Sequence, residues 1–175
     1  MSLSKHFSTE IYGKCSDVLK NINPEANIMG NTCERDTECE KNLFKNTKFY
    51  FAFENSNCSD YITEKFWRSL DFGLVPIILH PSKEYYKKVA PHNSFIHAAD
   101  FDYDPVRLAQ YLTRVSNNYE LYSKHRKWSL NYKVEYLATK VETVRMCELC
   151  YKLNTESSAI YYKNFAEWSG SGCSN

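Results

Sequence analysis

Short apolar runs alternate with amphipathic stretches over the middle of the chain. Lys48–Phe53 and Val75–Leu79 are nearly continuous apolar runs of strand length, which is typical of strands buried on both faces. Between them, apolar side chains recur at every fourth position, and this spacing predicts a helix. Asp60 is suited to cap the start of that helix and Gly73 to end it, so we expect it to lie between these two residues.

The same alternation continues toward the C-terminus. A short helix is expected from Pro81 or Ser82 to Val89, a third strand at 95–97 and an amphipathic helix over 105–115. Buried strands that alternate with helices predict βαβ units, and therefore an α/β fold with a parallel sheet covered by helices on both faces. Ligands of such sheets bind at the carboxyl ends of the strands, beside helix N-termini.

The segments on either side of this core are less regular. We expect a strand over 7–12, a loop over 14–34, a short helix over 34–44 and two helices within 117–153. The last residues are rich in Ser and Tyr and have little periodicity. We therefore predict one domain over 1–153, followed by a tail over 154–175.

Length and charge narrow the class of protein. The 175 residues have the length of a single domain, and 43% apolar and 25% charged residues are ordinary for a folded one. The 22 basic and 21 acidic residues give a net charge of +1, so no nucleic-acid partner is expected. The apolar runs are far shorter than the roughly 20 residues of a membrane-spanning helix, so membrane attachment would need an anchor outside this chain.

Seven cysteines are many for a chain of this length and favour an oxidising compartment. Four of them lie in the first third of the chain, where three pairings are open: Cys15, Cys33, Cys39 and Cys58. Cys147 and Cys150 have the spacing of half a zinc site, but no second pair of ligands lies nearby. Disulfides are therefore favoured over metal.

The strongest candidate site lies at the start of the helix that follows the first buried strand. Tyr61, Glu64 and Lys65 have the spacing i, i+3, i+4, which predicts one shared face of the first turns. The helix N-terminus and Lys65 suit a phosphate, Glu64 suits a sugar diol, and Tyr61 suits a ring or a phosphate. Together they indicate a nucleotide-diphosphate site. The alternative is an ordinary solvated helix start, stabilised by Thr63 or Glu64.

The residues around this site resemble a known family. The stretch Lys48–Trp67, with Phe-Glu-Asn-Ser followed by Asp-Tyr-Ile-Thr-Glu-Lys, is similar to the signature of the α1,3/4-fucosyltransferases, and Gly73–Leu79 continues the match. Ile11–Cys15 and Ser94–His97 resemble further blocks of that family. The resemblance covers most of the chain, from about Phe7 to Cys150.

The resemblance implies a fold and an activity. It implies the Rossmann-like donor-binding half of a GT-B glycosyltransferase, truncated at its N-terminus, in an enzyme that transfers L-fucose from GDP-fucose to GlcNAc of glycans. Glu64 would hold the ribose hydroxyls, Lys65 would meet the pyrophosphate, and Tyr61 would lie against the nucleotide-sugar. Glu54 and Asn55 would line the pocket at the strand end.

The resemblance also implies what this chain leaves to other parts of the protein. The acceptor domain and its general base are expected outside it, so no catalytic residue is assigned here and the isolated chain is expected to be inactive. No cofactor or metal is expected, because Lys65 and the helix dipole can take that role. The family implies the Golgi lumen, as part of a type II membrane protein, and it implies partners of Cys147 and Cys150 in the acceptor domain.

Two other interpretations stay open. Asp100, Asp102 and Asp104 form two overlapping Asp-x-Asp motifs, which in a GT-A glycosyltransferase hold a divalent cation beside the nucleotide. The simpler alternative for them is a solvated acidic turn that caps the helix beginning near Pro105. The chain is also compatible with an inactive fragment that binds GDP only.

Overall fold

The computed structural model describes residues 3–12, 27–30, 33–35, 37–135, 139–156, 158 and 161–174. Its strands are β1 Glu10–Tyr12, β2 Asn27–Gly30, β3 Phe49–Phe51, β4 Asn57–Cys58, β5 Val75–Ile78, β6 Ile96–His97 and β7 Cys173–Ser174. Its α-helices are α2 Glu38–Lys45, α3 Glu64–Asp71, α4 Lys83–Val89, α5 Pro105–Ser116, α6 Tyr119–Lys124, α7 Thr139–Thr155 and α8 Phe165–Gly170. Short 3-10 helices are η1 Leu3–Lys5, η2 Ala98–Phe101 and η3 Lys127–Leu130.

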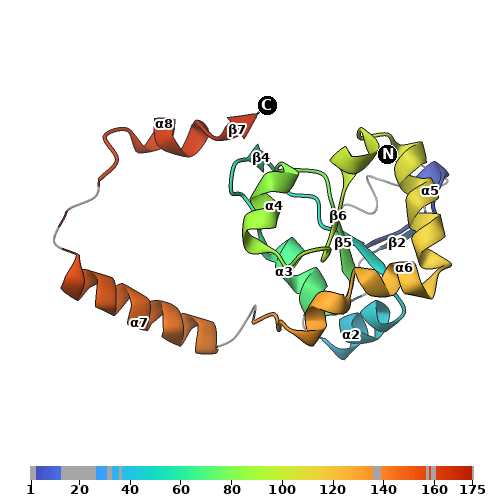
Figure 1. The fold of residues 1–175 in the computed structure, drawn as a ribbon, viewed down its shortest axis with the longest axis horizontal. Helices are drawn as coiled ribbons and strands as arrows, with labels where there is room; N and C mark the ends of the chain where they lie inside the picture. The colour runs from blue at the N-terminus through green and yellow to red at the C-terminus, as the bar shows by residue number, and fades with distance from the viewer. Residues whose placement is uncertain are drawn as a thin grey trace.

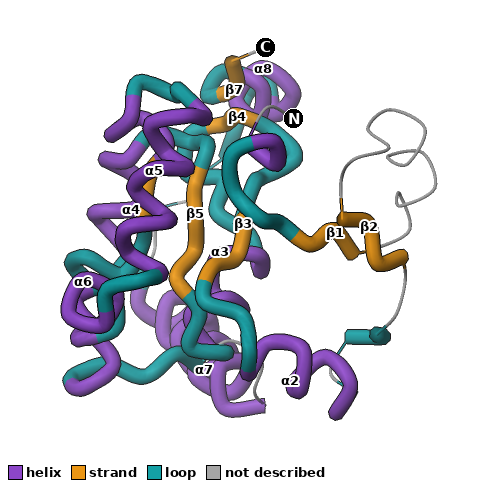
Figure 2. Tube along the Cα trace, turned by 90° about the vertical axis from the view of Figure 1, so that its right-hand side faces the viewer, coloured by secondary structure: helices purple, strands orange, loops and turns teal. Residues whose placement is uncertain are grey.

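A parallel sheet in the order β3-β5-β6 forms the centre of the fold (Figure 1). Helix α3 joins β3 to β5, and α4 joins β5 to β6, so the sheet consists of two successive βαβ units. This confirms the predicted Rossmann-like α/β fold. Figure 2 shows β3 and β5 side by side, with the separate parallel pair β1–β2 beyond β3.

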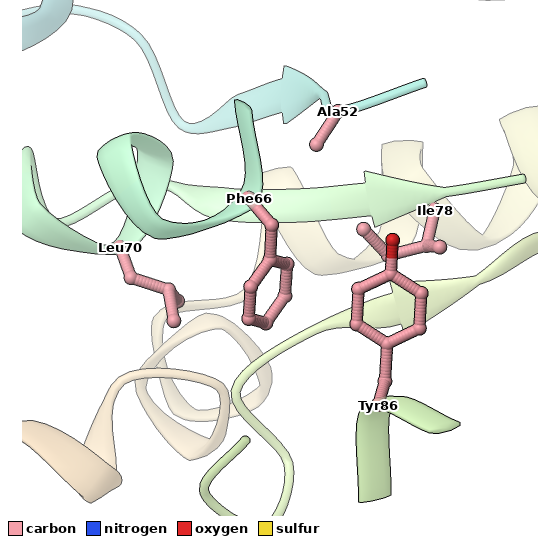
Figure 3. Packing of buried hydrophobic residues seen from close by; sticks show 5 residues of the cluster. All are labelled: Ala52, Phe66, Leu70, Ile78 and Tyr86. Atoms are coloured by element: carbon pink, nitrogen blue, oxygen red, sulfur yellow. The ribbon is translucent and has the colours of Figure 1, made fainter. Parts of the chain in front are cut away.

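Each face of the sheet is covered by different helices. Successive side chains of a strand point to opposite faces, so neighbours in sequence enter different clusters. Ile78 packs with Phe66 and Leu70 of α3 and Tyr86 of α4 (Figure 3). Ile77 belongs to a second cluster on the opposite face, with Val75, Ile96 and the α5 residues Leu108 and Leu112. The apolar runs noted in the sequence are therefore continuous because both faces of the sheet are buried.

The helix after β3 begins later than predicted. Asp60 has a φ of 60°, in the left-handed region, so it is not the N-cap that we expected. The N-cap is Thr63, whose hydroxyl accepts from the Lys65 amide at 3.5 Å. The predicted end is close to the observed one, because Gly73 adopts a φ of 72° two residues beyond the helix.

The outer segments also differ from the predictions. The expected loop over 14–34 is wrong at 27–30, which is strand β2, while 14–26 lie outside the described residues. The C-terminal region contains α8 and β7, and β7 pairs antiparallel with β4. Helix α7 lies apart from the sheet in Figure 1. No helix in the described part of the chain is long and apolar enough to cross a membrane.

Candidate functional site

Glu54 is a buried carboxylate that holds the start of α3 in place. It lies three residues after the end of β3, and the residue is only 5% exposed. One carboxylate oxygen accepts from the Thr63 amide at 2.8 Å, and the other accepts from the Thr63 hydroxyl at 2.6 Å. Both bonds are charge-assisted, and the first satisfies a backbone amide at the helix N-terminus that the helix itself leaves without a partner. Glu54 thus fixes the position of the first turn of α3.

Lys65 and Asn55 meet at the carboxyl end of β3. The Lys65 ammonium donates to the Phe53 carbonyl at 2.8 Å and to the Asn55 side-chain oxygen at 2.6 Å. An ammonium has three donors, so these two bonds leave a third for a ligand. The two contacts fix a positive charge at the sheet edge and beside the first turn of α3, where the helix dipole adds to it.

Glu64 carries a carboxylate that is kept ionised. Arg35 donates to its Oε1 at 3.4 Å, from a short loop that the Cys33–Cys39 disulfide closes. Burial raises the pKa of Glu64, but the hydrogen bonds from its own amide and from Arg35 outweigh it, so the pKa lies below the usual value. The Glu64 carboxylate can therefore accept hydrogen bonds from hydroxyl groups of a ligand.

Tyr61 lies in the loop before α3, so the predicted helical face shared by Tyr61, Glu64 and Lys65 is wrong. The reason is the later start of the helix at Thr63, which removes Tyr61 from its first turn. Its side chain is 37% exposed. In the part of the chain that the structure describes, no hydrogen bond joins the Tyr61 side chain to Glu54, Asn55 or Lys65.

A cleft of about 310 Å³ opens beside this edge, at the end of β5. It is lined by Asn57, Ser59, Leu79, His80, Pro81, Ser82, Tyr85, Tyr103 and Gly172, and we call it the β5 cleft. The His80 ring donates from Nε2 to the Glu54 carbonyl at 3.0 Å, which ties the cleft to the loop after β3. The position of His80 directly after a buried strand was its signal in the sequence. Nothing in the sequence pattern indicated Tyr103 or Gly172.

The Asp-x-Asp carboxylates already have partners within the fold. Asp100 accepts from the Lys83 ammonium at 2.7 and 2.6 Å, Asp102 is paired with Arg107, and Asp104 caps α5. Asp104 confirms the interpretation as a helix-capping turn. Among the residues that the structure describes, no group of three or more metal-ligating side chains is gathered.

The disulfides only partly follow the clustering of cysteines in the sequence. Cys33 pairs with Cys39, but Cys58 pairs with Cys173, 115 residues away and outside the N-terminal cluster. Cys147 and Cys150 are free, exposed thiols on α7. Cys15 lies outside the described residues.

Comparison with known proteins agrees with this fold. Residues 1–168 match the family model described as glycosyltransferase family 10 (fucosyltransferase), C-terminal part. The chain is 33% identical over 172 residues to glycoprotein 3-alpha-L-fucosyltransferase A of Drosophila melanogaster, an alignment that covers 95% of this chain and 30% of that protein. It is 31% identical over 168 residues to a 3-galactosyl-N-acetylglucosaminide 4-alpha-L-fucosyltransferase of Homo sapiens, covering 95% of this chain and 41% of that protein.

The parallel sheet and the family match together show that this chain is a Rossmann-like glycosyltransferase domain. The chain belongs to glycosyltransferase family 10, the fucosyltransferases. It spans less than half the length of these relatives.

Proposed function

We propose that this chain is the donor-binding domain of an enzyme that transfers L-fucose from GDP-fucose to GlcNAc of protein- or lipid-linked glycans. The observation that carries the proposal is the Lys65 ammonium, held by the Phe53 carbonyl and Asn55 at the edge where α3 begins. Parallel α/β sheets bind nucleotides at this edge, and a helix N-terminus favours their phosphates.

Each residue of the site then has a defined task. Lys65 binds the pyrophosphate and stabilises the charge that develops on it as GDP leaves the sugar. Glu64, ionised and oriented by Arg35, accepts hydrogen bonds from the ribose hydroxyls. Asn55 positions Lys65, Glu54 positions the helix start, and Tyr61 lies against the nucleotide-sugar.

The remaining parts of the reaction are assigned outside these residues. The acceptor glycan and the general base belong to an acceptor domain, so the isolated chain binds donor without transferring fucose. No metal cofactor is needed, since a fixed ammonium and a helix N-terminus can stabilise the leaving diphosphate. The compartment is the Golgi lumen, and the Cys33–Cys39 and Cys58–Cys173 disulfides fit an oxidising lumen.

Isothermal titration calorimetry with GDP and GDP-fucose tests the proposal. Lys65→Ala removes a charge-assisted contact, so the Kd for both ligands should rise about ten- to hundredfold. Lys87→Ala is the matched control, because Lys87 is an exposed lysine on α4 that pairs with Glu84. This variant should bind GDP and GDP-fucose with unchanged Kd values. A folded wild-type chain that binds neither ligand refutes the proposal. Binding that EDTA abolishes would instead support a metal-dependent enzyme with the Asp-x-Asp motif.

A further inference from the structure

The loop after β3 carries a sequence that the proposed donor site does not use. Asn57-Cys58-Ser59 has the form Asn-x-Ser with a middle residue other than proline, which is the acceptor sequence for N-linked glycans in secreted proteins. It is the only Asn-x-Ser or Asn-x-Thr triplet with such a middle residue in the 175 residues. The structure adds to this match the accessibility of the asparagine and the contacts of the triplet.

The acceptor asparagine lies at the surface of the fold. Asn57 and Ser59 are both exposed, and both line the β5 cleft. An N-linked glycan is bulky and stays in solvent, so its asparagine has to lie in a surface segment of the protein. The position of Asn57 therefore meets the first requirement for an acceptor.

The folded chain fixes every residue of this triplet. Asn57 and Cys58 form β4, which pairs antiparallel with β7 of the C-terminal segment (Figure 1). Cys58 is joined to Cys173, and the Ser59 amide donates to the Gly172 carbonyl at 2.6 Å. An acceptor asparagine has to enter the active site of the transferring enzyme, and a segment held in this way must first open to do so. The finished fold therefore withholds Asn57 from modification.

The order of synthesis leaves the same segment open for a time. Cys173 follows Cys58 by 115 residues, and it begins the strand β7 that pairs with β4. At roughly 5–20 residues per second, these 115 residues take about 6–23 s to synthesise. During that time neither the disulfide nor the β4–β7 ladder can form, and disulfide formation itself takes seconds to hours. The triplet is thus accessible in the growing chain and closed in the finished one.

We propose that Asn57 is an N-glycosylation site, and that closure of the Cys58–Cys173 disulfide competes with its modification. The inference rests on the lumenal compartment of the proposed function, but not on donor binding. The competition matters for the donor edge, because Asn55 on the same loop bonds the Lys65 ammonium. Asn57 lines a cleft of about 310 Å³, so a bulky glycan attached to it obstructs this edge. Closure before modification keeps the edge accessible.

The two competing steps use different atoms of the triplet. In glycosylation, the Asn57 Nδ2 forms a bond to the C1 atom of an oligosaccharide carried on a lipid diphosphate. The C1–O bond to the diphosphate breaks, the diphosphate leaves with the electron pair, and a proton of Nδ2 passes to a base of the transferring enzyme. In closure, the Cys58 and Cys173 thiols lose two protons and two electrons to the disulfide of an oxidoreductase, which becomes a dithiol.

Translation of the full chain behind a cleavable signal peptide, in the presence of microsomes, tests the inference. A glycosylated chain migrates on a gel as a slower band, which endoglycosidase H removes. In the wild-type chain this band should be the smaller part of the product under oxidising conditions and the larger part when dithiothreitol keeps the thiols reduced. Cys58→Ser retains an Asn-x-Ser triplet and removes the thiol, so its slower band should be the larger part under both conditions.

Two controls separate the site and the disulfide from general effects. Asn57→Gln should abolish the slower band. Cys33→Ser with Cys39→Ser removes a disulfide between residues only 6 positions apart, and under oxidising conditions its slower band should match that of the wild-type chain.

The possible outcomes have separate meanings. If neither the reduced wild-type chain nor Cys58→Ser shows the slower band, the glycosylation site is overturned, and a band that persists in Asn57→Gln overturns it as well. Equal bands in the oxidised and reduced wild-type chain overturn the competition with the disulfide. None of these measurements involves GDP, so a failure here is distinguishable from a failure of the proposed function in calorimetry.

Discussion

The buried histidine of β6 allows a quantitative test of how the site is supported. His97 is fully buried, and its two ring nitrogens join two loops at the carboxyl edge of the sheet. The Ala99 amide donates to Nδ1, so the proton must lie on Nε2, which donates to the Pro81 carbonyl. This pattern requires the neutral ring, because a protonated Nδ1 could no longer accept.

Removing the ring should be costly for its size. His97→Ala leaves the Pro81 carbonyl and the Ala99 amide without their partner, each at about 1–3 kcal/mol, and it leaves a cavity in addition. We expect a loss of about 3–5 kcal/mol in the free energy of unfolding. His92→Ala is the matched control, because His92 is exposed. This substitution should change the free energy of unfolding by less than about 0.5 kcal/mol.

The same histidine predicts a pH dependence with a defined sign. Burial lowers the pKa of His97 from its model-peptide value of 6.5, more than the hydrogen bond to Pro81 and the nearby Asp100 raise it. As the pH falls, the unfolded chain therefore takes up the proton at a higher pH than the folded chain does. The stabilisation that the neutral His97 ring provides is complete above pH 6.5 and is lost as the pH falls below it. His97→Gln removes this titrating group. The free energy of unfolding that the chain loses between pH 7.5 and 5.5 should therefore be smaller by up to about 1.4 kcal/mol.

Urea unfolding, followed by fluorescence at the two pH values, measures both effects. The wild-type chain should lose more stability on acidification than His97→Gln, and His125, whose pKa burial also lowers, adds the same background to both proteins. Identical pH slopes for the two chains would refute the neutral-ring assignment. If His97→Ala lowers the free energy of unfolding by less than about 1 kcal/mol, the structural role of the two His97 hydrogen bonds is refuted.

Three further predictions concern other parts of the fold. Glu40→Ala should lower the free energy of unfolding, measured by urea unfolding, by about 3 kcal/mol, because it removes the carboxylate that pairs with the buried Arg68. A loss below about 1 kcal/mol would contradict the buried pair. Gly73→Ala should lower the melting temperature, since φ is 72° there, and an unchanged value would show that the turn can relax. Arg35→Ala should weaken GDP binding about two- to fivefold in calorimetry but leave binding of 2′,3′-dideoxy-GDP unchanged, because Arg35 acts through Glu64; equal weakening of both would exclude that route.

Local pattern was sufficient for the sheet and its helices because both depend on burial. A strand covered on two faces must be apolar at every position, and β3 and β5 show this directly in the sequence. The start of α3 was harder to predict. Asp60 and Thr63 are both good N-caps by residue type, and only the buried carboxylate of Glu54, which bonds Thr63, selects the second.

The candidate site shows the same division. The predicted site residues of the strand-to-helix connection lie within a stretch of twelve: Glu54, Asn55, Glu64 and Lys65. This local connection brings them to one edge of the sheet without contacts from distant parts of the chain. The wall of the β5 cleft joins residues more than a hundred positions apart, through the Cys58–Cys173 disulfide and the pairing of β4 with β7. Periodicity reports on neighbours along one element, so it identified β3, β5 and the helices that join the strands of the central sheet. Which distant segment covers that edge depends on long-range closure of the chain, and only the folded structure determines it.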